Sequence, residues 1–193
     1  MPRTKQFDED VVLERAMNLF WSRGFEATSM QALVDNMGIN RGSLYGTFED
    51  KRTLFERALE RYDGAYRRDR FDRLETRYRP RRALEVFLAQ VIDESIEDEE
   101  RRGCFIVNTA LELAPHDPEI AAYVEQVRKE IVDSLTRIIR RGQDSGEIRS
   151  SEDAQTLART LLTVAFGLRV WARIAPRRKE MEQTMRAALA LLG

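Results

Sequence analysis

The side chains best suited to chemistry lie in one short segment, where Arg41, Ser43, Tyr45 and Lys51 bring hydrogen-bond donors and positive charge together. An arginine guanidinium can donate two parallel hydrogen bonds to the edge of guanine, and a hydroxyl group can bond to a base edge or a phosphate. A lysine in the first turn of a helix adds its charge to the helix dipole, and both favour phosphate. These residue types predict recognition of a nucleic acid.

The elements around this segment are predicted to be short helices joined by a tight turn. Helical spacing of apolar residues predicts one helix from Asp8 to about Arg23 and a second that begins after Thr28. Gly38 supplies the turn, and Asn40 is a suitable cap for a third helix. A helix held at a fixed angle after such a turn is the arrangement with which proteins read the DNA major groove.

The composition favours an all-helical fold. Ala, Leu, Glu and Arg dominate, and no segment alternates strictly between apolar and polar residues. No apolar run reaches the length of a membrane span and the N-terminus lacks a signal-peptide core, so we expect no membrane association. The single cysteine cannot support a disulfide framework, which favours a reducing cytoplasm.

The charge balance is not that of a simple nucleic-acid-binding protein. The chain has a formal net charge of −1, and residues 1–60 carry eight Lys or Arg against ten Asp or Glu. If this part binds DNA, its positive groups must lie on one face, with the acids of the first helix directed away. The groups expected on that face are Arg3, Lys5, Arg41, Lys51 and Arg52.

The segment from Met30 to Phe48 resembles the DNA-binding domain of the TetR family of transcriptional regulators. The combined spacing of Gly38, Tyr45, Phe48 and Lys51 is the specific part of the match. The other matching residues are Leu33, Ile39, Gly42, Ser43, Leu44, Leu54 and Phe55. The resemblance is strong over residues 8–60 and architectural beyond them.

The chain departs from the family pattern at three positions. Val34 and Met37 stand where members usually have alanine, and these bulkier residues predict a shifted angle between the second and third helices. Gly46 stands where histidine is common, which removes one DNA contact.

The resemblance implies a helix-turn-helix domain of three helices over residues 1–50, with its motif at about 29–48, followed by a six-helix effector-binding and dimerisation domain over residues 51–193. It also implies a homodimer that binds a palindromic double-stranded operator, most often as a repressor, and that a small-molecule effector releases. The expected DNA contacts are Thr28, Ser29, Asn40, Arg41, Gly42, Ser43, Tyr45 and Lys51, with Arg3 and Lys5 as an arm over the minor groove.

The C-terminal part is expected to supply the effector pocket and the dimer surface. The pocket candidates are Tyr62, Tyr66, Phe87, Val91, Phe105, Asn108, Thr109, Glu112, Phe166 and Trp171. Asn108 and Glu112 are four residues apart, so they share a helix face and either orient a ligand or join neighbouring helices. A helix expected from Ser151 to about Ile174 is apolar over most of its circumference, and the expected dimer contacts there and in the last helix are Leu161, Ala165, Leu168, Met185 and Leu189.

Several alternatives stay open at this level. Cys104 lies near Arg101 and Arg102 at an expected helix start, so it is either a sensor of electrophiles or oxidants or an inert core residue. The lone histidine, His116, is a weak metal signal, and neither a metal nor a cofactor is expected. Without a nucleophile elbow, phosphate loop or ligand cluster, an enzyme is not expected. The main rival is a helical adaptor that binds only proteins.

Overall fold

The computed structural model describes residues 7–65 and 69–193, and every element of regular structure within them is helical. The predicted all-helical fold is therefore confirmed. The chain divides into two compact units, of which the first ends at Ala65. No helix of the described part is long and apolar enough to cross a membrane.

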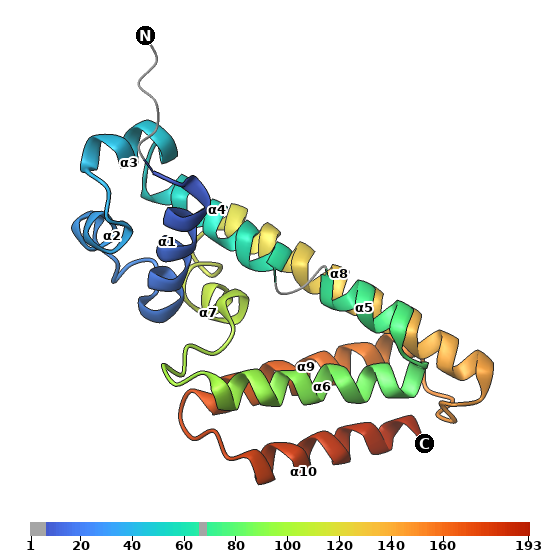
Figure 1. Ribbon diagram of the computed structural model, residues 1–193. Helices are drawn as coiled ribbons and strands as arrows, with labels where there is room; N and C mark the ends of the chain where they lie inside the picture. Colours follow the sequence, from blue (N-terminus) through green and yellow to red (C-terminus); the bar gives the residue numbers. More distant parts are fainter. Residues whose placement is uncertain (1–6, 66–68) are drawn as a thin grey trace. The chain divides into compact units, whose positions relative to one another are not determined.

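The first unit contains four helices, drawn in blue to turquoise in Figure 1. They are α1 (Glu9–Arg23), α2 (Met30–Met37), α3 (Arg41–Phe48) and α4 (Lys51–Asp63). Side-chain caps determine where they begin: Asn40 Oδ1 accepts a hydrogen bond from the Ser43 N–H at 2.8 Å, and Asp50 Oδ1 accepts one from the Thr53 N–H at 2.7 Å. Each cap satisfies a backbone donor that the helix itself leaves without a partner.

A largely aromatic core fixes the angle of α3 within this unit. Phe20, Phe48 and Phe55 are buried, and the Phe55 ring meets Phe20 edge-on at a centroid distance of 5.1 Å. Leu33 of α2 and Leu44 of α3 are also fully buried. Because truncating one large core side chain costs about 3–5 kcal/mol, α3 has little freedom to leave this position while the unit stays folded.

The first unit extends past the predicted domain boundary at residue 50. α4 packs along α1, and its residues Leu54, Ala58 and Leu59 are buried. Three short helices alone bury too little apolar surface to be stable, so α4 is needed to close the core. The compact unit therefore includes a helix that the sequence placed in the second domain.

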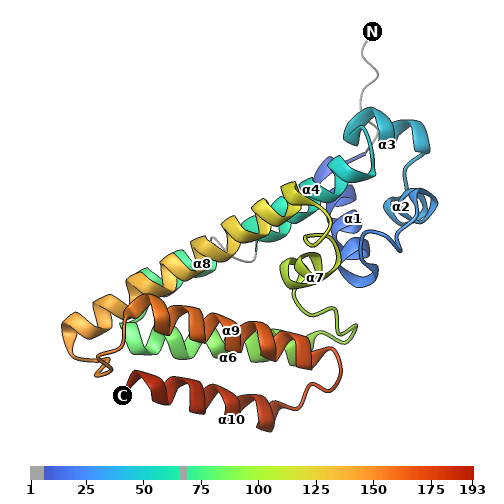
Figure 2. The same ribbon diagram turned by 180° about the vertical axis from the view of Figure 1, so that it is seen from behind.

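The second unit is built around a long helix, α8. Its elements are α5 (Asp69–Arg77), α6 (Pro80–Glu97), α7 (Phe105–Glu112), α8 (Pro118–Ser145), α9 (Ala154–Ala172), α10 (Arg178–Leu189) and a short 3₁₀ helix, η2 (Ala190–Leu192). α6, α8 and α9 pack against one another, and α10 contacts both α6 and α9 (Figures 1 and 2). Leu88, Leu135 and Ala158 lie fully buried at the centre of their shared core.

The described residues contain ten α-helices, one more than the nine expected. The additional helix lies after Asp50, where the chain forms two separate helices, α4 and α5. α4 ends at Asp63 with Gly64 as its C-cap, and α5 begins separately at Asp69. Glycine within a helix costs about 1 kcal/mol relative to alanine, and the acids Asp69 and Asp72 favour a new helix start.

Two helices also begin slightly later than predicted, because the residue that caps each of them lies further along the chain. α2 is capped by Ser29, whose Oγ accepts a hydrogen bond from the Ala32 N–H at 3.1 Å, and not by Thr28. α9 is capped by Asp153, whose carboxylate accepts from the Thr156 N–H at 2.8 Å, and not by Ser151. In both cases the observed cap lies one or two residues after the residue at which the helix was expected to start.

Candidate nucleic-acid interface

α3 presents its polar side chains on one outer side. Arg41 and Tyr45 are exposed and lie four residues apart, while Leu44 and Phe48 are fully buried on the opposite side. The Arg41 guanidinium carbon lies 6.0 Å from the centre of the Tyr45 ring, at the outer limit of a cation–π contact. The contact keeps the guanidinium beside the helix and leaves its N–H donors available.

The start of α3 is shaped by the residues around Asn40. The Asn40 side chain caps the helix through its oxygen, so its amide nitrogen remains for an outside partner. Gly42 is exposed and Ser43 is half-buried. These residues place backbone and small side chains at the helix N-terminus, where a groove or a phosphate can approach closely.

The two predicted contacts at α2 behave differently from each other. Thr28 is fully buried, and its hydroxyl donates a hydrogen bond to the Gly24 carbonyl oxygen at 2.6 Å. Its side chain is therefore a structural element of the turn, which corrects its assignment as a phosphate contact. Ser29 is exposed at the helix N-terminus, where a cap and an incoming phosphate use the same group of backbone donors.

Lys51 occupies the first position of α4. Its ammonium nitrogen lies 4.2 Å from the centre of the Phe25 ring, a cation–π contact that holds the side chain at the helix N-terminus. The neighbouring Asp50 is the cap, and the backbone N–H of Thr53 holds the pKa of its carboxyl below the usual value. The predicted phosphate contact thus directly follows an acid whose charged form the start of α4 stabilises.

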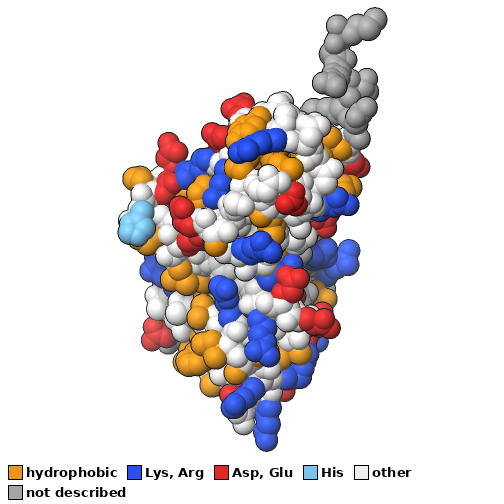
Figure 3. All heavy atoms as spheres, turned by 90° about the vertical axis from the view of Figure 1, so that its left-hand side faces the viewer, with side chains coloured by type: hydrophobic (Ala, Val, Ile, Leu, Met, Phe, Trp, Pro, Cys, Tyr) orange, Lys and Arg blue, Asp and Glu red, His pale blue; other side chains and the backbone are white. Residues whose placement is uncertain are grey.

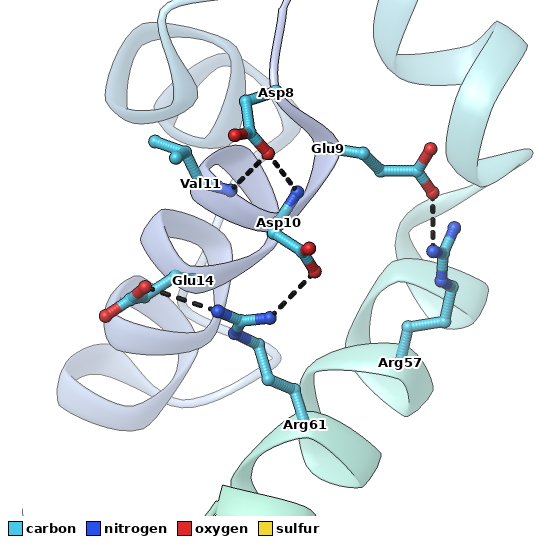
Figure 4. A network of polar contacts seen from close by, with 7 residues as sticks. All are labelled: Asp8, Glu9, Asp10, Val11, Glu14, Arg57 and Arg61. Atoms are coloured by element: carbon cyan, nitrogen blue, oxygen red, sulfur yellow. Dashed lines mark hydrogen bonds and ion pairs between the residues drawn. The ribbon is translucent and has the colours of Figure 1, made fainter.

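The acids of α1 pair with arginines of α4 (Figure 4). Arg57 Nη2 lies 2.5 Å from Glu9 Oε1, and Arg61 reaches Asp10 Oδ1 at 3.0 Å and Glu14 Oε2 at 3.3 Å. These pairs offset part of the negative charge of α1 within the unit, while the predicted direction of the acids away from DNA stays a prediction. Over the upper part of Figure 3, Lys or Arg and Asp or Glu side chains are mixed, so no broad positive area is visible on that face.

The predicted N-terminal arm, Arg3 and Lys5, lies outside the described residues. Its contact with the minor groove stays a prediction.

The turn before α3 depends on Gly38. Its φ of +70° is left-handed, and a Cβ there would lie 3.2 Å from Nη1 of Arg15. The same Nη1 donates a hydrogen bond to the Met37 carbonyl oxygen at 3.1 Å, which braces the turn. The left-handed backbone favours glycine, and a side chain there would also displace the Arg15 guanidinium by a few tenths of an ångström.

We expect Gly38→Ala to destabilise the protein by about 1–2 kcal/mol, because alanine is strained in the left-handed region. We also expect weaker binding to operator DNA, because the Arg15 brace must shift. Gly146→Ala is the matched control, since Gly146 has a φ of +75° with nothing within 4 Å of its added Cβ. The melting temperature should fall for both variants, whereas the affinity for operator DNA should fall only for Gly38→Ala. Equal DNA affinities of the two variants would contradict this role of the turn.

The predicted pocket residues do not form a single group. Tyr62 belongs to the first unit, where its ring packs on Trp21 at a centroid distance of 5.0 Å, and Trp171 is 67% exposed, so neither lines an interior pocket of the second unit. Tyr66 lies outside the described residues. The remaining candidates are Phe87, Val91, Phe105 and Thr109, which are buried, and Asn108, Glu112 and Phe166, which are half-buried.

Asn108 joins neighbouring segments. Its Nδ2 donates to the Arg102 carbonyl oxygen at 2.8 Å, and its Oδ1 accepts from Arg173 Nη1 at 3.0 Å. The Thr109 hydroxyl donates to the carbonyl oxygen of Phe105, on its own helix, at 2.9 Å. Of the two roles that the sequence allowed for Asn108, these contacts support the structural one.

A polar cluster on α6 was missed in the sequence. The Glu94 carboxylate pairs with both Arg70 of α5 and Arg169 of α9, whose side chains are only 12% and 11% exposed. One turn earlier, Gln90 Oε1 is buried and accepts no hydrogen bond within the described part of the chain. The available signal was the spacing of Gln90 and Glu94, which are four residues apart and so share one face of the helix.

Comparison with known proteins places this geometry in a family. Residues 12–58 match the family model described as bacterial regulatory proteins, tetR family, and residues 80–188 match the tetracyclin repressor-like C-terminal domain. The chain belongs to the TetR family. The family predicted from Gly38, Tyr45, Phe48 and Lys51 is thereby confirmed.

Individual relatives of this TetR-family protein span nearly its whole length. It is 32% identical over 193 residues to the uncharacterized HTH-type transcriptional regulator YezE of Bacillus subtilis (strain 168), covering 100% of both chains. It is 29% identical over 180 residues to the HTH-type transcriptional repressor ComR of Escherichia coli (strain K12), covering 89% of this chain and 82% of ComR. Among solved structures, a cysteine variant of the TetR family regulator CifR, complexed with a 26-base-pair operator DNA, matches with a TM-score of 0.87 and 33% identity over 100% of both chains.

The predicted dimer residues of this TetR-family chain lie inside its own core. Leu161, Ala165, Leu168 and Leu189 are each at most 8% exposed, and Met185 packs against the same cluster. Leu161, Ala165, Leu168 and Leu189 therefore have little surface left for a partner, whereas Met185 is half-buried, and dimer contacts by these five residues stay a prediction. α9 buries its broad apolar side within its own unit, and a different row faces outward.

The outward row of α9 is apolar toward its C-terminal end. Val170 and Trp171 are 40% and 67% exposed, and Ile174, in the turn that directly follows the helix, is 66% exposed. Thr163 and Gly167 extend the row toward the N-terminus of α9. Large exposed apolar side chains on one helix face mark a surface for another protein.

Cys104 is buried at the N-cap position of α7. This burial agrees with a core role, and sensing by this cysteine stays a prediction. His116 is exposed in the loop before α8. Among the described residues, no group of three or more His, Cys, Asp or Glu is placed to hold a metal ion.

Proposed function

We propose that the chain is a transcriptional repressor that binds a palindromic DNA operator as a homodimer. The observation that carries this proposal is the outer side of α3, where Arg41 and Tyr45 are exposed on a capped helix whose other side is locked into a core. A rigid helix with a planar donor and a phenolic hydroxyl on one side fits base edges and phosphates in the major groove. The relatives ComR, a repressor, and CifR, complexed with operator DNA, support it.

The homodimer follows from the outward row of α9. A two-fold dimer would bury this row against its copy, and it would present two α3 helices to half-sites separated by one or more helical turns of DNA. A 26-base-pair operator, the length bound by CifR, has room for two such half-sites.

The function is tested by titrating the dimer against a palindrome found beside its own coding region and against random DNA of equal length. We expect operator binding to be at least about 10³-fold tighter than random binding at physiological salt, and both affinities to fall steeply as salt rises. A protein-binding adaptor would bind neither duplex and show no salt dependence. That result would overturn the proposal.

A small-molecule effector is proposed to bind in the second unit. Gln90 Oε1, which is buried and accepts no hydrogen bond from residues 7–65 or 69–193, and Glu94 one turn later supply polar groups beside apolar side chains of α6. Ligand sites use this mixture. A ligand that binds the released state more tightly than the DNA-bound state would lower operator affinity. Compounds that raise the melting temperature should be those that weaken operator binding, and Gln90→Leu should remove both effects together.

A further inference from the structure

The link between α3 and α4 is a strained turn centred on Glu49. Glu49 has φ +63° and ψ −64°, and the Asp50 N–H donates to the Phe48 carbonyl oxygen at 2.6 Å. A hydrogen bond across one residue with these angles defines the γ-turn of the uncommon, strained type. Positive φ at a residue with a side chain costs of the order of 1–3 kcal/mol, a cost that glycine avoids.

No contact of the Glu49 side chain with the described residues compensates for the cost of its positive φ. It is exposed, and within residues 7–65 and 69–193 its carboxylate makes no hydrogen bond or ion pair. The neighbouring charges have structural partners: Asp50 caps α4 through the Thr53 N–H, and Arg52 bonds to Glu56 at 2.5 Å. Glu49 is the charge in this turn that is available to act on an outside partner.

We infer that Glu49 limits the affinity of the protein for DNA by repelling the phosphate that Lys51 and the N-terminus of α4 bind. This inference rests on the proposed function. Glu49 stands two residues before Lys51, and together with Asp50, the cap of α4, it places two carboxyl groups directly before the lysine in the chain. A like charge close to a phosphate opposes binding to every DNA sequence equally, since phosphates carry no sequence information.

The test compares Glu49→Gln with Glu60→Gln in titrations against operator and random duplexes. Glu60 is also exposed and lies on α4, nine residues beyond Lys51, which is about 14 Å along the helix and more than a Debye length at 0.1 M salt. We expect Glu49→Gln to tighten binding to both duplexes by about two- to threefold per head at low salt, hence about four- to tenfold for the dimer. Its salt dependence should steepen by up to about one unit of slope per head.

A second variant separates the charge from the backbone. Glu49→Gly removes both the carboxylate and the left-handed strain, so it should bind as Glu49→Gln does and melt a few degrees higher. If the unaltered protein binds the duplexes and Glu49→Gln matches Glu60→Gln in affinity and salt slope, the inference is overturned. If the unaltered protein binds neither duplex, the proposed function fails instead.

Discussion

Val170→Glu should convert the protein into a monomer that no longer holds its operator. Val170 lies in the outward row of α9, beside Trp171 and Ile174. In a two-fold dimer both copies of the new carboxylate would be buried without a partner, which costs several kcal/mol per charge. Loss of the dimer removes the gain from binding two half-sites at once, about 10²- to 10⁴-fold in affinity. Sedimentation at micromolar concentration and an operator titration measure the two effects.

Ala122→Glu is the matched control for this experiment. Ala122 is exposed on α8, so the same charge enters the same unit at a site outside the row. The control should remain dimeric and bind the operator normally. A Val170→Glu protein that is still dimeric would show that the dimer forms through another surface.

Arg41→Ala should abolish most of the preference for the operator over random DNA. A bidentate contact between arginine and guanine contributes about 1–3 kcal/mol of discrimination, and a dimer makes it twice. We expect a loss of roughly 5- to 150-fold in the affinity ratio for each head that uses the contact. The measurement is the pair of dissociation constants for operator and random duplexes at one salt concentration.

Two further variants make this result specific to Arg41. Lys51→Ala should weaken binding to both duplexes equally and reduce the salt slope by about one unit per head, because a phosphate contact reads no sequence. Arg23→Ala removes an exposed positive charge from the last turn of α1 and should change neither the ratio nor the slope appreciably. An Arg41→Ala protein that keeps the full operator preference would remove Arg41 from the reading surface.

The helix-turn-helix was largely predictable because its determinants are local. Asn40 caps α3 as expected, Asp8 caps α1 at the predicted helix start, and Gly38 adopts the left-handed turn between α2 and α3. Leu44 is buried, as its place opposite Arg41 required. Caps, turns and one-sided helices depend on residues only a few positions apart, so a single sequence contains the needed information.

The dimer residues could not be predicted in the same way. α9 is apolar around most of its circumference, so its pattern does not say which side faces its own chain. Leu161 and Leu168 proved to be core residues, while the less continuous row with Val170 and Trp171 faces outward. The predicted phosphate contact of Thr28 could not be judged from the sequence for a related reason. The position of its hydroxyl depends on how the chain folds back to Gly24. Tertiary packing determines both the outward side of α9 and the hydrogen bond of Thr28.

The pairs between α1 and α4 have a mechanical consequence. Arg57 and Arg61 fasten α4 to three acids of α1, and Phe55 fastens it to the core that holds α3. The chain leaves this unit for the second one through the end of α4. A displacement of the C-terminal end of α4 would therefore move α3 together with α1 and α4 as one rigid unit.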